Sequence, residues 1–368
     1  MATAIRVEML PARLGDCLLV ECLRTDGTVW RMLVDGGPPD TWPLLEARLR
    51  RLGPADRRLD VVVVTHIDSD HIGGMVPFFG GDLARGFLDV GDVWFNGRTH
   101  LGEPGAPRSV PQGESVVAAL LGPVGGHGAP GLPWNRAFGG GPVLTPTSGM
   151  HEVTVDHGPR ITVLSPPEAR LEALRTSWTT FLKRALSGRD RGLRSPPDVL
   201  APLDDLRAVA ATRTPTDASI PNGSSIALLV EHRGASLVLG ADAFGPVLAA
   251  GLKAVATARG LEALPVDAVK LPHHGSKSNV VASLVSAAPA RHYLVSSNGD
   301  TFHHPDDAAL ARVVVGAPPG MTLGFNYRNA RTQRWADPAL TSRYGHAAAY
   351  PSPGGEEAGY VLELPARD

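Results

Sequence analysis

Four side chains of the types that bind divalent metal ions occur within six consecutive positions of this chain. They are His66, Asp68, Asp70 and His71. The run 59–64 directly before them is mainly apolar and β-branched, which is typical of a buried strand. Imidazoles and carboxylates at the end of such a strand would each cost roughly several kcal/mol to bury without partners. We therefore predict a divalent-metal site here. The alternative, a solvated polar loop, rarely combines these ligand types at this spacing.

Three further polar clusters follow apolar stretches in the same way. The carboxyl ends of strands converge at one edge of an open α/β sheet, so clusters in this position predict one shared site. Each cluster also has a plainer interpretation: a carboxylate can cap a helix, and one of two adjacent histidines can merely support the other. The clusters are Asp242 after 237–241, His273 and His274 after 269–272, and Asn298, His303 and His304 after 293–297.

The ligand types indicate which metals the site would take. Imidazole combined with carboxylate, without thiolate, suits zinc, manganese or iron. More than five candidate ligands predict two ions, with one carboxylate able to bridge them. Two ions roughly 3.5–4 Å apart can hold a water, lower its pKa and stabilise both oxygens of a hydrolytic transition state. The residues thus point to hydrolytic chemistry.

The elements expected to position these clusters alternate between strands and helices. Thr41 is predicted to cap the first helix, with Pro43 in its first turn. Gly73 and Gly74 let the backbone pack closely where the helix after the ligand motif begins. An antiparallel start followed by strand–helix alternation predicts a layered α/β sandwich. Strands are expected over 5–10, 18–23, 29–34, 59–64, 161–164, 225–231, 235–239, 268–271, 293–295 and 360–364, and helices over 41–52, 115–121, 168–186, 246–259 and 305–315.

Composition limits the class of protein. With 368 residues, 43% of them hydrophobic, and a net charge of -2, the chain fits a globular protein with a sizeable core. This charge gives no global basic field for nucleic acid, although a local groove can still be positive. The absence of an apolar leader or a run of about 20 apolar residues predicts a cytoplasmic protein without a membrane segment. We expect one domain over 1–368, with irregular Gly/Pro-rich inserts at 97–150 and 187–219 bordering the site.

The order of these motifs resembles that of the metallo-β-lactamase superfamily. The ligand motif at 66–74, the Gly-Ala-Asp at 240–242 and the His-His-Gly-Ser at 273–276 carry the resemblance. Within the superfamily, the chain is similar to the hydrolase domain of ComEC-type competence proteins and their stand-alone soluble relatives. This likeness also includes 14–19, 33–37 and Asn298 with His304-Pro305. It spans residues 5 to about 315 without the inserts.

The resemblance implies a four-layer αββα sandwich and a site for two metal ions. His66 and Asp68 would bind the first ion, and Asp70 and His71 the second. Asp68 stands where the family usually has a histidine, which favours manganese or iron or weakens the first zinc position. The other implied ligands are a bridging Asp242, His273 at the second ion and, in about the right place for a third ligand of the first ion, Asn222, Ser224 or Ser225.

The activity implied by the resemblance is hydrolysis by a metal-bound hydroxide, most readily of a phosphodiester or nucleic acid. Asp70 or Asp242 would orient the hydroxide. His304, ahead of a predicted helix N-terminus, would bind a phosphate or protonate a leaving group. Two alternatives remain open: a hydrolase of lactones, amides or thioesters, and a binding or regulatory module with a degenerate site. The sequence names no protein partner. Further candidates for substrate binding are His274, Ser276, Lys277, Asn298 and His303, and Asp35 can support the metal ligands through hydrogen bonds.

Overall fold

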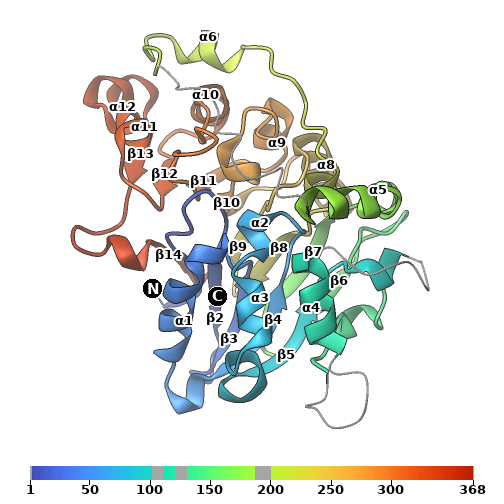
Figure 1. Ribbon diagram of the computed structural model, residues 1–368. Helices are drawn as coiled ribbons and strands as arrows, with labels where there is room; N and C mark the ends of the chain where they lie inside the picture. Colours follow the sequence, from blue (N-terminus) through green and yellow to red (C-terminus); the bar gives the residue numbers. More distant parts are fainter. Residues whose placement is uncertain (1, 102–110, 122–130, 187–199, 368) are drawn as a thin grey trace.

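Two mixed β-sheets lie against each other in the computed structural model, which describes residues 2–101, 111–121, 131–186 and 200–367 (Figure 1). The first sheet has the order β14-β1-β2-β3-β4-β5, and the second β13-β12-β11-β10-β9-β8-β7-β6. The strands of the first are β1 (Thr3–Met9), β2 (Leu18–Leu23), β3 (Val29–Val34), β4 (Arg58–Val63), β5 (Asp89–Trp94) and β14 (Tyr360–Pro365). Those of the second are β6 (Glu152–Thr154), β7 (Arg160–Ser165), β8 (Ala227–His232), β9 (Ala235–Leu239), β10 (Val266–Lys270), β11 (Ala290–Val295), β12 (Thr322–Phe325) and β13 (Ala347–Ala349).

Helices cover the outer face of each sheet. The apolar cluster between the sheets contains strand residues of both, among them Val20 and Leu237. A second cluster joins the first sheet to α1, α3 and α4, and a third joins the other sheet to α8, α9 and α10. The predicted αββα sandwich is therefore confirmed. The helices are α1 (Trp42–Arg50), α2 (Ser69–Ile72), α3 (Met75–Gly80), α4 (Pro111–Leu121), α5 (Glu168–Leu186), α6 (Leu206–Ala210), α7 (Ile220–Gly223), α8 (Gly245–Ala258), α9 (Ala282–Ala287), α10 (Asp307–Gly316), α11 (Ala330–Gln333) and α12 (Pro338–Tyr344).

Most predicted elements form with boundaries shifted by a few residues. The predicted ranges 168–186 and 235–239 coincide with α5 and β9. The capping contact predicted for Thr41 is wrong, because Thr41 precedes α1 but makes no side-chain hydrogen bond to it. The sequence gives little sign of β5, because Gly91 and two aspartates interrupt its apolar pattern.

The predicted irregular inserts are partly ordered. Within 97–150, α4 begins at Pro111 rather than at the predicted Ser115. Within 187–219, α6 is capped by the Asp205 side chain, which accepts hydrogen bonds from two backbone N–H groups. The remaining parts of these inserts at 102–110, 122–130 and 187–199 lie outside the described residues.

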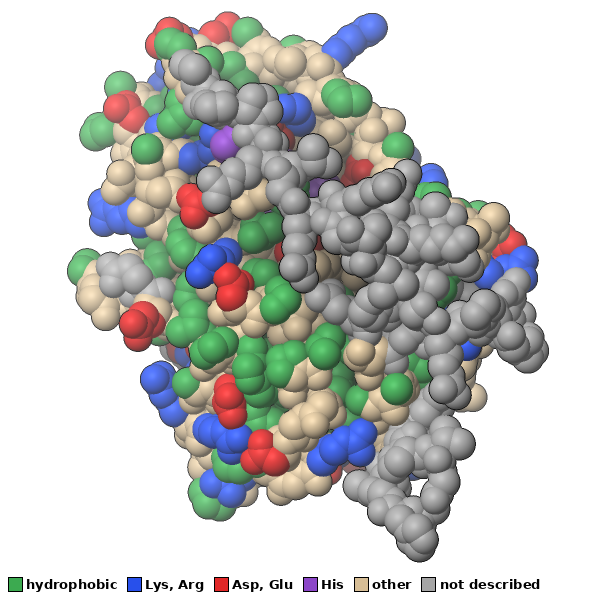
Figure 2. All heavy atoms as spheres, viewed as in Figure 1, with side chains coloured by type: hydrophobic (Ala, Val, Ile, Leu, Met, Phe, Trp, Pro, Cys, Tyr) green, Lys and Arg blue, Asp and Glu red, His purple; other side chains and the backbone are tan. Residues whose placement is uncertain are grey.

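The surface carries charges of both signs. On the face drawn in Figure 2, the described basic and acidic side chains are interspersed, as the composition predicts. None of the helices in the described ranges has the length and apolar content that crossing a bilayer requires.

Glycines interlock the turn after β3 with the segment that carries the ligand motif. Gly36 N–H donates to His71 O at 2.9 Å, and Gly74 N–H donates to Gly37 O at 2.9 Å. A Cβ on Gly74 would lie 2.1 Å from Gly36 O, so only glycine allows this approach. The close packing predicted for Gly74 is confirmed. The β3 and β4 ends are thereby held in one arrangement.

We expect Gly74→Ala to lower the free energy of unfolding by about 1–3 kcal/mol, because the added methyl group must displace backbone. Urea denaturation followed by circular dichroism measures the effect. Gly80→Ala is the matched control, since a Cβ on Gly80 meets no atom of the described residues within 4 Å. It should be neutral or stabilising by up to about 1 kcal/mol. Equal stabilities of the two variants would contradict the interlock.

Candidate metal centre

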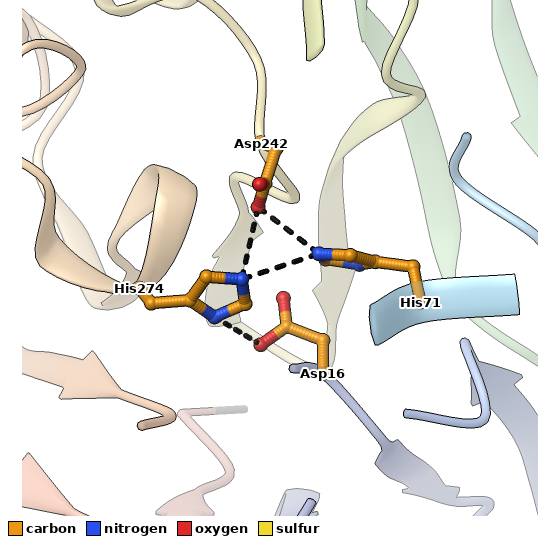
Figure 3. A group of neighbouring side chains, drawn as sticks. All are labelled: Asp16, His71, Asp242 and His274. Atoms are coloured by element: carbon orange, nitrogen blue, oxygen red, sulfur yellow. Dashed lines mark hydrogen bonds and ion pairs between the residues drawn. The ribbon is translucent and has the colours of Figure 1, made fainter. Parts of the chain in front are cut away.

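Four buried side chains from distant parts of the chain converge at the strand ends. Figure 3 shows Asp16, His71, Asp242 and His274 facing one another, with ligand atoms within 4.8 Å. His71 Nε2 lies 3.3 Å from Asp242 Oδ1, and His274 Nε2 lies 3.5 Å from the same oxygen. The two Nε2 atoms are 3.2 Å apart. Asp16 lies in the connection between β1 and β2, whereas His71 follows β4, Asp242 follows β9 and His274 follows β10.

The hydrogen bonds of the two imidazoles determine which ring nitrogen faces the centre as an acceptor. His71 Nδ1 lies 2.8 Å from Asp35 Oδ2, and His274 Nδ1 lies 2.9 Å from Ser296 O. Both partners are oxygens that can only accept, so each Nδ1 carries the donated proton. In its neutral form each ring therefore has an Nε2 lone pair, which is directed at the other ring and at Asp242. Metal-bound histidines are oriented in this way.

This convergence of acceptors requires a positive charge. Asp242 Oδ1 is buried and has no hydrogen-bond partner in the described structure. Burial alone would lower the pKa of His71, but nearby carboxylates, Asp242 first among them, hold that pKa well above its usual value. Burial would raise the pKa of Asp242, but His274 and His71 hold it well below the usual value. A proton or a metal ion would satisfy this field, and the imidazole–carboxylate set fits a divalent metal.

A third imidazole, His66, lies beside this group. Its ring centroid is 4.2 Å from that of His71. His66 Nδ1 lies 3.0 Å from Thr65 Oγ1, and this hydroxyl donates to Asp35 Oδ2 at 2.7 Å. His66 Nε2 is buried and has no hydrogen-bond partner among the described residues; Asp68 Oδ2 lies 3.7 Å from it. His66 thus directs a free lone pair toward the more exposed Asp68 carboxylate.

Asp70 lies close to the imidazoles of both His71 and His274. Its Oδ2 is 3.9 Å from His71 Nε2 and 3.6 Å from His274 Nε2. The structure therefore brings Asp70 and His71 of the motif together with Asp242 and His274, with the His66 ring beside His71. The Asp68 side chain is 40% exposed and lies 3.7 Å from His66 Nε2.

The two adjacent histidines occupy positions other than those predicted for them. His274, predicted to bind substrate, is the one in the buried group. His273, predicted to complete the second ion, approaches the centre only through its Nε2, 3.7 Å from Asp242 Oδ2. Both have positive φ values, 48° and 54°, which turn the two rings in different directions. The geometry favours exchanging the two predicted roles.

His273 is held by a polar network that sequence reasoning missed. Its Nδ1 lies 2.9 Å from Asn279 Oδ1 and 3.3 Å from Asp217 Oδ2. Asn222, a candidate third ligand, instead donates to Asp217 Oδ2 at 2.8 Å. These contacts lower the pKa of Asp217 to about 2 against the opposing effect of burial. The network keeps the His273 Nε2 directed toward Asp242. Of the other candidates, Ser224 donates to Pro221 O, while the buried Ser225 hydroxyl has no partner in the described structure.

A buried ion pair was also missed. The Lys270 side chain is fully buried and pairs with Asp16 Oδ2. Asp16 Oδ1 has no hydrogen-bond partner in the described structure and lies 3.4 Å from His274 Nδ1. Burial would raise the pKa of Asp16, but Lys270 and His274 keep it below its usual value. The only sequence feature that could have indicated Asp16 is the Leu-Gly-Asp segment at 14–16, which is part of the family resemblance.

The remaining predicted residues lie farther from the centre. The His304 ring is 5.2 Å from that of His273, and His304 Nδ1 is 3.3 Å from Asp306 Oδ2. The anion site predicted at the following helix is not favoured, because α10 begins with Asp307 and Asp306 is its N-cap. The others contact their own loops: Lys277 Nζ pairs with Asp306, Ser276 Oγ accepts from Ser278 N–H, Asn298 Nδ2 donates to Asp300 and His303 Nδ1 lies near Gly299 O.

Comparison with known proteins gives a family for the segment that contains the motif. Residues 10–80 match the family model described as Metallo-beta-lactamase superfamily. No curated protein sequence matches the chain. Among solved structures, the metallo-beta-lactamase fold protein YhfI from Bacillus subtilis shares 9% identity at a TM-score of 0.43, covering 99% of this chain and 100% of that one.

Two further solved structures are similar to the chain. A diphosphatase from the PhnP family shares 13% identity at a TM-score of 0.37, covering 98% of both chains. The metallo-beta-lactamase MIM-1 from Novosphingobium pentaromativorans shares 15% identity at a TM-score of 0.32, covering 84% of this chain and 89% of that one. Likenesses this weak assign neither a substrate nor ligand residues.

We expect Asp35→Asn to weaken binding of manganese or zinc by about 10–100-fold, because an amide cannot accept all the hydrogen bonds that orient His71 and Thr65. Titration calorimetry measures the affinity. Asp92→Asn is the control: Asp92 is also a buried carboxylate, and it accepts hydrogen bonds from Trp94 Nε1 and Arg136 N–H. That variant should lose stability but keep its metal affinity. If both variants bound metal like the wild type, Asp35 would have no orienting role.

Proposed function

We propose that this chain is a metal-dependent phosphodiesterase or nuclease of the metallo-beta-lactamase superfamily. The match of residues 10–80 to the model of that superfamily and the αββα fold support the proposal. One observation carries the metal-dependent part of the proposal. The lone pairs of His71 Nε2, His274 Nε2 and Asp242 Oδ1 meet within 3.5 Å in a buried space. A binding or regulatory module with a degenerate site would not require these acceptor atoms to converge.

The residues divide into two sets of ligands for two ions. Asp70, His71 and His274 would hold one ion, and His66 and Asp68 the other. Asp242 would bridge them. When bound, the two ions would supply Lewis acidity and an activated water. The set is rich in carboxylates, so manganese or iron suits it as well as zinc does.

The other residues of the site would orient these ligands and bind the substrate. Asp35 and Ser296 O hold the imidazoles of His71 and His274 in one orientation. Burial lowers the pKa of His304 although Asp306 opposes this, so the ring is neutral near pH 7. A neutral His304 is suited to hydrogen-bonding a substrate oxygen or accepting a proton. The leaving-group protonation predicted from the sequence is less favoured.

Phosphodiester substrates are preferred because of the resemblance to ComEC-type hydrolase domains, which is part of this proposal. Two bridged ions suit the in-line displacement at phosphorus, where charge grows on both the attacking and the leaving oxygen. Lactones, amides and thioesters remain the alternative substrates, since the same centre can attack an acyl carbon. A panel of substrates separates these classes.

We expect the manganese-loaded protein to hydrolyse bis-p-nitrophenyl phosphate and plasmid DNA, and to lose this activity in a chelator. His71→Ala and Asp70→Ala should abolish turnover while circular dichroism shows a folded chain. Nitrocefin and a simple lactone complete the panel. Turnover of these two alone would remove the nuclease assignment. A protein purified without metal and unaffected by added manganese or zinc would favour a binding module.

The two adjacent histidines give a separate expectation. His274→Gln should reduce the affinity for one of the two ions by about 100-fold or more, because it removes a buried lone pair from the centre. His273→Gln should have a smaller effect, since its Nε2 approaches only Asp242 Oδ2. Metal content after dialysis, measured by mass spectrometry, reports both. A larger effect of His273→Gln than of His274→Gln would instead favour the ligand set predicted from the sequence, with His273 at the second ion.

A further inference from the structure

An exposed aromatic ring is linked to the candidate metal centre through the rings of two histidines. In the described structure the large exposed hydrophobic side chains are Leu261, Phe302 and Val361. Single exposed hydrophobics are common and need no explanation by themselves. Phe302 is 45% exposed, as is Leu261, but only Phe302 has a ring contact that leads toward the centre.

Two ring contacts link Phe302 to His273 through His304. The Phe302 ring centroid lies 6.4 Å from that of His304, and the His304 centroid lies 5.2 Å from that of His273. His273 Nε2 is 3.7 Å from Asp242 Oδ2. A substrate that reacts beside Asp242 and extends over His304 would therefore come within reach of Phe302.

The loop that carries Phe302 is firmly held. Asn298 N–H donates to Arg13 O at 2.7 Å, and Asn329 Nδ2 donates to Asn298 O at 2.9 Å. His303, directly after Phe302, has a φ of 59°, and its Nδ1 lies 3.2 Å from the carbonyl oxygen four residues earlier. Backbone in this sparsely populated conformation is kept only where its surroundings fix it. The backbone around Phe302 is thus held in one conformation, and the Phe302 ring is exposed to solvent.

We propose that Phe302 is a specificity residue that stacks on a planar aromatic group next to the scissile bond, such as a nucleobase or an aryl ring. This rests on the proposed hydrolase function and narrows its substrates. An exposed ring on a fixed loop pays little conformational entropy when a planar group covers it. Stacking of a base on an aromatic side chain contributes about 5- to 150-fold in affinity.

The test compares two ligands that differ at C1 of the sugar, where one carries a base and the other a hydroxyl group. Thymidine 5′-monophosphate and 2-deoxyribose 5-phosphate are titrated into the full manganese-loaded chain by calorimetry. The wild type should bind the thymidine ligand at least about five-fold more tightly. Phe302→Ala should remove this preference, and Phe302→Trp should keep it.

Leu261→Ala is the matched control. Leu261 is equally exposed but lies beyond the far end of the 14-residue helix α8, which begins three positions after Asp242. It is therefore roughly 20 Å from the centre, the length of that helix. This variant should keep the wild-type preference and activity.

A kinetic arm uses bis-p-nitrophenyl phosphate and methyl p-nitrophenyl phosphate, which share a leaving group and differ in the second substituent. Phe302→Ala should lower kcat/KM for the first by about five-fold or more relative to the second. A preference for thymidine that depends on Phe302, without any phosphodiester turnover, would support the stacking role and reject the phosphodiesterase. Equal binding of both ligands by the wild type, binding of neither, or a preference that survives Phe302→Ala would overturn the proposal.

Discussion

The buried carboxylate of Asp35 is the constraint on which the site depends. It accepts hydrogen bonds from Thr65 N–H at 2.8 Å and Thr65 Oγ1 at 2.7 Å, and it faces His71 Nδ1 at 2.8 Å. Through Thr65 it also acts on His66 Nδ1. One carboxylate at the end of β3 therefore orients two imidazoles that follow β4. The glycine contacts between the two segments keep Asp35 at this distance, so the packing of the backbone determines the geometry of the ligands.

Buried charge is balanced in pairs around this centre. Asp16 is neutralised by Lys270, and Asp217 is surrounded by donors from Asn222 and Asn279. Asp242 differs, because its side chain has neither a lysine nor an amide donor in the described structure and only histidines lie close to it. A buried carboxylate without a donor is costly unless a cation compensates it. The uncompensated charge is thus concentrated at the one place where imidazole lone pairs also converge.

The rule that polar clusters follow buried strands predicted much of the fold and the site, because it depends on local sequence. It found 66–71, Asp242 and the two histidines after β10. It could not find Lys270, which looks like an ordinary strand residue, or its partner Asp16, which lies 254 positions away. It could not rank His273 against His274 either. That choice depends on their positive φ values and on Ser296 and Asn279, which only tertiary structure brings to the rings.

The two halves of the centre differ in how firmly they are held. His71 and His274 are buried. The Nδ1 of His71 is hydrogen-bonded to Asp35 Oδ2, and that of His274 to the backbone oxygen of Ser296. On the other side, the Asp68 side chain is 40% exposed and reaches His66 Nε2 only at 3.7 Å. Preorganised ligands lose less conformational entropy on binding. An ion at His71 and His274 is therefore favoured over one at His66 and Asp68. Occupancy of the weaker position would then depend on Asp242, the proposed bridging ligand, and on any ligand atoms that the substrate supplies.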